Sequence, residues 1–321
     1  MRILLSISFL FCILYSHAQI TFTTYHDKKG KETKIPEEAH YIKTLTINND
    51  EQGTVSVRET FVESNKTKLI GTFKSFKEKH YIGTRLEAYE NGKMKSKINY
   101  SFDGKVIDTA YHYHPNGKLK LAFEYPNNVE KGKTKVTDTL ILVYNDSTGK
   151  RHLVDGNGYA EIDLYNEIEK GNYENHKRVG EWTGEFMNGK YTFKETYQNG
   201  KIISGISIDS AGNNYPYTEK NFMTPPDYPG GIKNFQYAII NNFRYPKEAI
   251  SNNVNGTMKA SFKIDPTGTL KDIVIEQGLG YGTEQEFINV LKRTKKWTPG
   301  IKRGVPVNVK YSIPLRINVS R

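Results

Sequence analysis

Two histidines have the spacing of a metal site in this 321-residue chain. His112 and His114 alternate, which would place both rings on one face of a strand. Zinc sites in proteins take at least three protein ligands, and no third ligand can be identified here. We therefore interpret the pair as part of an exposed strand face, and we expect no metal site.

The other chemistry-bearing residues form no catalytic pattern. Acidic residues are common, but no constellation of acid, base and nucleophile can be argued. Gly278, Gly280 and Gly282 lack the spacing and the following acidic residue of a dinucleotide-binding loop, and we interpret them as a flexible turn. Cys12 is the only cysteine, so no disulfide framework or thiolate site is expected. The sequence predicts no enzyme and no cofactor.

The first eighteen residues have the pattern of a signal peptide. Arg2 precedes an apolar run over 3–15, and Ser16-His17-Ala18 is a small-x-small cleavage signal. The alternative is an uncleaved membrane anchor, but a spanning helix needs about 20 apolar residues and polarity begins at His17. We expect cleavage of residues 1–18 and an exported protein, in the periplasm or associated with the cell envelope.

The chain is basic, with a formal net charge of +11. Such a balance raises nucleic acid as a partner, but export argues against it. The positive residues are spread along the chain, often as Gly-Lys at turns. We interpret them as solvated faces of turns and strands, with non-specific attraction to an anionic envelope surface as the alternative.

A short motif recurs over much of the chain: an aromatic residue or histidine, polar residues, then Asn-Gly-Lys or Asp-Gly-Lys. It occurs at 89–93, 102–105, 114–118, 186–190 and 197–201. Asn-Gly and Asp-Gly supply the positive φ angles of tight hairpin turns. Between the turns, segments such as 118–125 alternate apolar and polar residues, as strands do. The pattern predicts an extended antiparallel meander of strands joined by two-residue turns, with neighbouring units stacked.

One unit of this meander carries a family resemblance. The segment Gly171–Trp182 contains Gly-x-Tyr and then x-x-Gly-x-Trp, and it resembles the MORN-type repeats, especially the YwqK-like variant of bacterial envelope proteins. The resemblance covers about 67–215, with a diverged stretch near 127–159. Residues 21–63 are expected to add strands to the same sheet. The resemblance implies a β-repeat fold and little about function.

Prolines crowd between 216 and 229 and predict a domain boundary. We therefore divide the chain into a β-repeat domain over 19–215, a Pro-rich linker over 216–228 and a C-terminal domain over 229–321. The order predicted for the last domain is helix, short helix, two strands, helix and a final strand. The fold class is thus a mostly β repeat meander followed by an α+β domain.

Periodicity places the core of the C-terminal domain. Its first helix has an apolar stripe of Ile232, Phe235, Ile239 and Phe243, and it must end before Pro246. A short helical turn over 246–251 follows. The strand 257–264 alternates, with Met258, Ala260, Phe262 and Ile264 on one face.

The remaining elements follow from turn and cap signals. A type I turn at 265–268 leads to a returning strand over 270–276. Thr283 and Glu286 predict a capping box for a helix that buries Phe287, Val290 and Leu291. The final strand is predicted over 305–319, where Pro306 and Pro314 favour an edge or interrupted strand.

Six segments together resemble the TonB C-terminal domain family in order and spacing. They are Asp227-Tyr228-Pro229-Gly230-Gly231, Tyr245-Pro246, Val254-Asn255-Gly256-Thr257, Phe262-Lys263-Ile264-Asp265-Pro266-Thr267-Gly268, Trp297-Thr298-Pro299-Gly300 and Val309-Lys310-Tyr311-Ser312-Ile313-Pro314. The resemblance covers the whole module and implies an antiparallel sheet with two helices.

The resemblance also implies a function. In that family the domain is periplasmic and binds a short segment of an outer-membrane transporter by adding it as a strand to its sheet. By position, Tyr245 and Pro246 match the Tyr-Pro motif near the transporter contact. Val307, Val309 and Tyr311 lie in the strand that offers its edge. We expect these five residues to bind the partner, and exposed edges also make a homodimer plausible.

Two departures separate this chain from an energy transducer of that family. Such a transducer needs an uncleaved inner-membrane anchor and a long Pro-rich spacer, whereas here the leader is expected to be cleaved and β repeats occupy the place of the spacer. Our first hypothesis is an exported binding protein that docks an envelope protein, with an outer-membrane protein as the expected partner. The alternative is a TonB-type transducer that keeps its N-terminal anchor.

Overall fold

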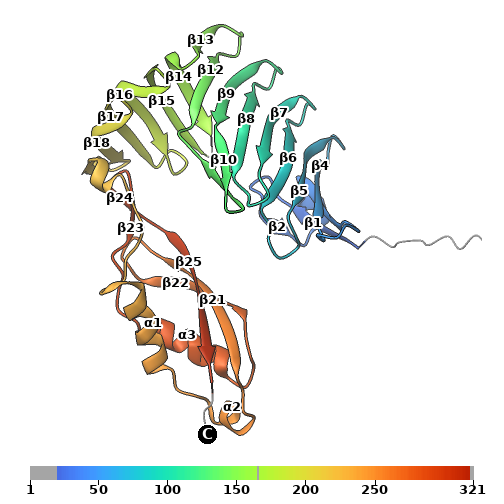
Figure 1. The fold of residues 1–321 in the computed structure, drawn as a ribbon, viewed down its shortest axis with the longest axis vertical. Coiled ribbons are helices and arrows are strands. Elements are labelled where there is room, and N and C mark those ends of the chain that lie inside the picture. Colours follow the sequence, from blue (N-terminus) through green and yellow to red (C-terminus); the bar gives the residue numbers. More distant parts are fainter. Residues whose placement is uncertain (1–19, 165, 319–321) are drawn as a thin grey trace, which may run out of the picture. The chain divides into compact units, whose positions relative to one another are not determined.

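The computed structural model of the protein describes residues 20–164 and 166–318. The predicted signal peptide lies outside these residues. The chain divides into two compact units, 1–158 and 159–321, which are coloured from blue to green and from yellow-green to red in Figure 1. Each unit is described by itself.

The first unit is an antiparallel β meander. β1 pairs with β2 and β3, the strands from β3 to β9 pair each with the next, and β12 pairs with β9 and β13. β10 and β11 form a separate hairpin between β9 and β12. The elements are β1 (Thr21–His26), β2 (Glu32–Thr33), the 3-10 helix η1 (Pro36–Glu38), β3 (Tyr41–Ile47), β4 (Val55–Phe61), β5 (Thr67–Phe73), β6 (Tyr81–Ala88), β7 (Met94–Tyr100), β8 (Val106–Tyr113), β9 (Leu119–Tyr125), β10 (Asn127–Glu130), β11 (Lys133–Val136), β12 (Leu140–Asn145) and β13 (Arg151–Val154).

Among the Gly-Lys turns, the one at 197–201 is the predicted two-residue turn: Gln198 pairs with Lys201, and Asn199 and Gly200 both have positive φ. The turns at 89–93, 101–105 and 114–118 have a longer loop.

In the turn over 89–93, the Gly92 N–H donates to the Tyr89 carbonyl and the Tyr89 N–H donates to the Lys93 carbonyl. Gly92 has φ 86°, so the loop contains three residues and ends in a left-handed glycine. The Asn91 side chain accepts from the Lys93 N–H at 2.9 Å. The prediction of a two-residue turn is therefore wrong here, because the Asn91 side chain accepts from the Lys93 N–H and Asn91 does not adopt positive φ.

Turn lysines connect successive hairpins. The ammonium groups of Lys66, Lys93 and Lys118 donate to backbone carbonyls of Asn91, Asn116 and Thr148, each in the next turn along the same edge. The Asn91 amide likewise donates to the Pro115 carbonyl at 2.7 Å. All three lysines are exposed, in agreement with our interpretation of turn lysines as solvated charges, and each one also satisfies a carbonyl of a neighbouring turn.

Strand glycines lie against aromatic rings of the adjacent strand. A Cβ atom on Gly71 would come within 2.8 Å of the Tyr81 ring, and one on Gly171 within 2.5 Å of the Trp182 ring. Trp182 is fully buried, and its indole N–H donates to the Asn172 carbonyl at 3.2 Å. Gly171, the first glycine of the Gly-x-Tyr pattern, and Gly71 outside it therefore provide the space in which these rings pack.

The second unit contains the last meander strands and the C-terminal domain. The pairings of β15 with β16, β16 with β17, β17 with β18 and β18 with β19 are all antiparallel. The elements are β14 (Asn157–Leu164), β15 (Glu167–Glu174), β16 (Lys177–Phe186), β17 (Tyr191–Gln198), β18 (Lys201–Asp209), β19 (Asn214–Tyr217), the 3-10 helix η2 (Glu219–Asn221), β20 (Met223–Thr224), α1 (Gly231–Asn242), α2 (Lys247–Ser251), β21 (Gly256–Ile264), β22 (Leu270–Gln277), α3 (Thr283–Arg293), β23 (Gly300–Lys302), β24 (Val305–Val307) and β25 (Val309–Ile317).

The C-terminal domain has one apolar core between its helices and a three-stranded sheet in the order β22-β21-β25. The predicted face of β21 is confirmed, since Met258, Ala260, Phe262 and Ile264 are all buried. The predicted fold class, a β meander followed by an α+β domain, is likewise confirmed. Ile232, however, is 40% exposed and does not join the core stripe of α1.

Two local predictions in this domain are wrong. The final strand is divided at Asn308, so that β24 pairs with β23 and β25 pairs with β21. The capping box is absent as well. Gly282 is the N-cap of α3, the Thr283 hydroxyl donates to the Gly280 carbonyl, and the Glu286 carboxylate accepts from Arg244 and Arg293 instead.

Candidate partner-binding edge

β25 is the outer strand on one side of the C-terminal sheet. Its only strand neighbour among the described residues is β21, and the two are matched over nine consecutive antiparallel pairs, from Gly256–Ile317 to Ile264–Val309, without irregularity. A regular outer strand presents a row of backbone N–H and C=O groups with the spacing that another strand needs. The edge of β25 is therefore geometrically suited to strand addition.

Pro314 indicates which backbone groups face outward. It is paired with Lys259 inside the regular ladder, and a proline is accommodated in a sheet where its nitrogen points away from the neighbouring strand. Because strand geometry repeats every two residues, the backbone groups of Ser312 and Arg316 also face away from β21. The predicted edge character of the strand around Pro314 agrees with this arrangement.

The opposite edge of the sheet is irregular. The pairing of β22 with β21 shifts register twice, near Lys259 and near Lys263. Asp272 in β22 has φ 49°, and its carboxylate is 2.7 Å from the Lys263 ammonium. Bulges and charged side chains of this kind prevent a further strand from pairing. The two edges are therefore not equivalent, and β25 is the open one.

Side chains of β25 alternate between the core and the solvent. Tyr311 is half-buried, and its ring lies 6.0 Å from that of Phe262 and 5.3 Å from that of Trp297. Val309, also half-buried, is paired with Ile264. Lys310, Ser312, Pro314 and Arg316 are exposed. Of the predicted contact residues, Val309 and Tyr311 thus lie on the open strand, with their side chains on its inner face.

The other predicted contact residues lie elsewhere. Tyr245 is at the far end of β25, where its hydroxyl donates to the Asn318 carbonyl at 3.0 Å and accepts from the Asn318 N–H at 3.2 Å. Pro246 is the N-cap of α2. Val307 belongs to β24 and is paired with Gly300. The structure therefore places Val309 and Tyr311 on β25, Tyr245 beside Asn318 just past the other end of that strand, and Val307 on a separate hairpin.

A groove beside β25 was not anticipated from the sequence. It has a volume of about 410 Å³ and lies between α1 and β25, with Tyr237, Ile240, Ile313 and Leu315 among its lining residues. Tyr237 is 60% exposed and Ile240 is 55% exposed. Lys233 and Arg316 are the charged residues that line it. Its signal in the sequence is the apolar content of α1 outside the Phe235–Ile239 stripe.

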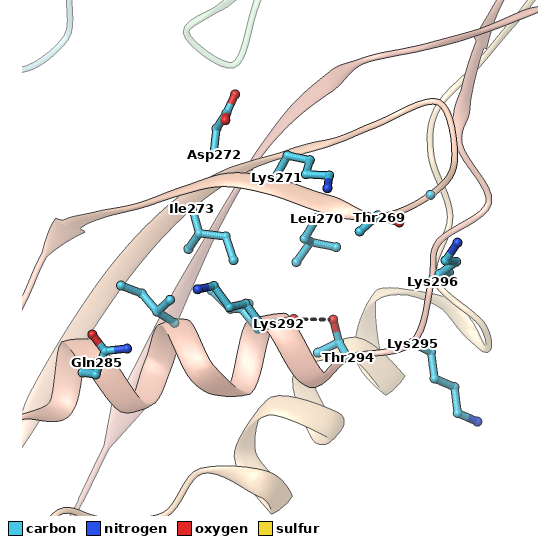
Figure 2. Close-up of a pocket in the computed structure, with 13 residues that line it drawn as sticks. Thr269, Leu270, Lys271, Asp272, Ile273, Gln285, Lys292, Thr294, Lys295 and Lys296 are labelled. Carbon is cyan, nitrogen blue, oxygen red and sulfur yellow. Dashed lines mark hydrogen bonds between the residues drawn. The ribbon is translucent and has the colours of Figure 1, made fainter.

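A second cleft, of about 610 Å³, lies between β22 and α3. Figure 2 shows that its lysines, Lys271, Lys292, Lys295 and Lys296, point in different directions and do not converge. The Thr294 hydroxyl donates to the Leu291 carbonyl at 2.7 Å and so satisfies the end of α3. The lysines there complement the negative end of the helix dipole.

The ionisable groups near the sheet have structural partners. The Lys259 ammonium, 2.7 Å from Glu276, lowers the pKa of that carboxyl group. The Thr267 hydroxyl lowers the pKa of Asp265 by hydrogen bonding in the β21–β22 turn. Within residues 20–164 and 166–318, no three His, Cys, Asp or Glu side chains are grouped as metal ligands. His114 instead bonds the Asn145 carbonyl at 2.9 Å.

Comparison with known proteins identifies the C-terminal domain. The family model described as Gram-negative bacterial TonB protein C-terminal matches residues 241–318. A similar solved structure is the NMR solution structure of Helicobacter pylori TonB-CTD, with 21% identity, a TM-score of 0.21, and coverage of 28% of this chain and 95% of that one. Among curated proteins no match was found. A TonB C-terminal domain thus lies at residues 241–318, and such domains interact with outer-membrane receptors in the periplasm.

None of the helices in the described part of the chain is both long enough and apolar enough to cross a membrane.

Proposed function

We propose that this protein is an exported, periplasmic or envelope-associated binding protein that docks an outer-membrane protein by strand addition to β25. The match of residues 241–318 to the TonB C-terminal family supports the partner class. The observation that carries the proposal is the contrast between the regular edge of β25 and the bulged edge of β22. Backbone hydrogen bonds of β25 would supply affinity, and neighbouring side chains would supply selectivity.

The charges beside the edge favour an acidic partner segment. Lys310 and Arg316 are exposed on β25, and Lys233 lies across the groove on α1. The apolar surface of Tyr237 and Ile240 would accept a large apolar side chain of the added strand. In this proposal Tyr245 holds the end of β25 through Asn318, and Val309 and Tyr311 support the strand from its inner side. Pro246 and Val307, which lie on α2 and β24, would contact the partner only beyond the ends of β25.

In the same proposal the meander is a MORN-like or YwqK-like scaffold, and the protein is not an enzyme and binds no cofactor. The transducer hypothesis differs in one property, the fate of the first eighteen residues. N-terminal sequencing of the protein from its native envelope separates the two: a mature chain that begins at Gln19 excludes an anchored transducer.

Replacing Ser312 with proline tests the edge directly. The substitution removes an outward N–H group and, like the natural Pro314, leaves the ladder with β21 intact. The matched control is Ser312→Ala, which removes the hydroxyl group and keeps the N–H. Each full-length variant would be used to capture detergent-solubilised outer-membrane proteins, with identification by mass spectrometry.

We expect the unmodified chain and Ser312→Ala to capture the same outer-membrane protein, and Ser312→Pro to lose at least about ten-fold in affinity, the effect of roughly 1.4 kcal/mol. Capture of no outer-membrane protein by the unmodified chain would sink the proposal. Equal binding by Ser312→Pro would show that the partner does not pair with β25.

A further inference from the structure

The hairpin formed by β23 and β24, residues 300–307, has an unusual tip. Its strands pair Gly300 with Val307 and Lys302 with Val305, which leaves Arg303 and Gly304 as a two-residue turn. Both have positive φ, 49° and 74°. Turns of this kind favour Asn, Asp or Gly at both positions, and positive φ is costly for a long side chain. The contacts of Arg303 must therefore offset this cost.

Arg303 is only 2% exposed, and its guanidinium group bonds three carboxylates of the meander. Its Nε donates to Glu195 at 2.8 Å, one Nη donates to Glu167 at 3.2 Å, and the other donates to Glu169. Glu167 and Glu169 are on β15 and Glu195 is on β17. A planar fork with five donors matches several carboxylates at once, whereas a lysine could not.

The carboxylates that accept from Arg303 are themselves held in place by other side chains. Glu195 is 1% exposed, and it accepts from the Tyr217 hydroxyl at 2.8 Å and from the Tyr197 hydroxyl at 3.1 Å. Burial is the main cause that raises the pKa of Tyr217, and the negative charge of Glu195 is the second cause. The Tyr217 hydroxyl therefore keeps its proton. Arg178 pairs with Glu169 and Lys302 pairs with Glu167. Three basic and three acidic groups therefore balance within the cluster.

Aromatic rings and backbone groups also contact the tip of the β23–β24 hairpin. The guanidinium carbon of Arg303 lies 3.9 Å from the centre of the Phe193 ring. The Arg303 carbonyl accepts from the fully buried Ser207 hydroxyl at 2.8 Å, and its N–H donates to the Phe222 carbonyl at 2.6 Å. Val305 packs against Phe186 and Phe193.

Gly304, the second residue of the turn, lies close to the backbone of β19. A Cβ atom at this position would approach the Tyr215 carbonyl oxygen to 2.9 Å. Any larger residue would separate the turn from β19, in addition to the strain of its positive φ.

We propose that the strands β15–β19, here called the repeat end, are a docking surface for the β23–β24 hairpin, and that Arg303 fixes the C-terminal domain to this surface. The segment 218–227 is then not a free linker, because η2 and β20 lie within it and β20 pairs with β23. The domain that carries β25 works as one rigid body with the repeat end. This inference concerns the chain alone and does not depend on strand addition.

The test measures the distance between the repeat end and the domain in the full-length chain. Spin labels would be attached at Lys194→Cys on β17 and Gln285→Cys on α3, both exposed positions, in a Cys12→Ser background. Double electron–electron resonance then gives the distance distribution. The variants are Arg303→Ala and Glu195→Gln, and the control is Arg293→Ala, whose side chain is half exposed and pairs with Glu286 on its own helix.

We expect a single narrow distribution for the reference chain and for Arg293→Ala, and a broad one for Arg303→Ala and Glu195→Gln. Fluorescence of Trp182 and Trp297, one buried in each region, reports whether both remain folded. If Arg303→Ala unfolds the repeat end, Arg303→Lys and Glu195→Gln take its place in the test, and both are expected to give a broad distance distribution. A broad distribution in the reference chain, or a narrow one in every folded variant, would overturn the inference.

Discussion

The repeat end and the C-terminal domain bury their side chains in different ways. The core of the C-terminal domain is a continuous apolar cluster from α1, α3 and the three-stranded sheet, and the buried Arg303 lies outside this cluster, at the tip of the β23–β24 hairpin. The repeat end buries large rings such as Trp182 and Phe186 beside a charged group, Glu195. In the C-terminal domain, helices cover the sheet and so enclose an apolar core. Meander strands fill their space with rings beside glycines and with satisfied polar groups. The two regions should therefore respond differently to substitution and to pH.

The largest effect is expected from Phe262→Ala in the C-terminal domain. Phe262 is 1% exposed, and its ring packs against those of Phe235 and Tyr311. We expect the free energy of unfolding of this domain to fall by about 3–5 kcal/mol, because a core cavity is created. Hydrogen exchange measured by mass spectrometry should accelerate in β21 and remain unchanged in β4–β9. The control Val274→Ala, at a 56% exposed position, should change little.

An intermediate effect is expected from Gly171→Ala in the repeat end. The added methyl group would lie 2.5 Å from the Trp182 ring, and such overpacking typically costs about 1–3 kcal/mol. Thermal unfolding followed by circular dichroism would measure it. The double variant Gly171→Ala with Trp182→Leu should lose much less than the sum of the single variants. Additive losses would show that the glycine is not required by the ring.

The smallest effect concerns acid. Burial lowers the pKa of His112 to about 4, from an ordinary value of 6.5. The unfolded chain therefore binds a proton more readily than the folded chain. Above pH 6.5 His112 is neutral in both the folded and the unfolded chain, and the full stability is present. As the pH falls from 6.5 to 4, the unfolded chain takes up this proton first, so the free energy of unfolding decreases.

His112→Phe should remove this part of the acid sensitivity, about 1 kcal/mol once the partial exposure of the ring is allowed for. Urea unfolding of the first unit at pH 7 and pH 4.5 measures it. An unchanged pH dependence in the variant would contradict the assignment. The uncharged core of the C-terminal domain should show no comparable loss over this interval.

Regular periodicity made the C-terminal domain predictable. The buried face of β21 follows from strict alternation, and the edge position of β25 follows from Pro314. In the folded chain, Phe193 and Tyr197 share the buried face of β17. The same alternation places Glu195 on that face, but a lone acidic residue on a buried face gives no indication of its partner.

Three features could not be read from the sequence, because they depend on distant contacts or on local competition for hydrogen bonds. Arg303 is 108 residues away from Glu195, and its Arg-Gly turn resembles an ordinary exposed hairpin. The turn at Asn91-Gly92 was misjudged because the Asn side chain competes for backbone N–H groups and adds a residue to the loop. The groove beside β25 needs two elements at once, and the apolar residues of α1 outside its core stripe indicate only one of them.

The bonds from Lys66, Lys93 and Lys118 to the next turn have a consequence for evolution. Each lysine bonds a backbone carbonyl and packs over the turn glycine one hairpin away, so it requires of that hairpin only a turn of the same kind. Duplication or loss of a whole hairpin would leave every remaining junction intact. Since strands are spaced about 4.8 Å apart, each such event would change the length of the array by about 10 Å. The length of the meander can thus change in steps of one hairpin, and such a step requires no change in the rest of the chain.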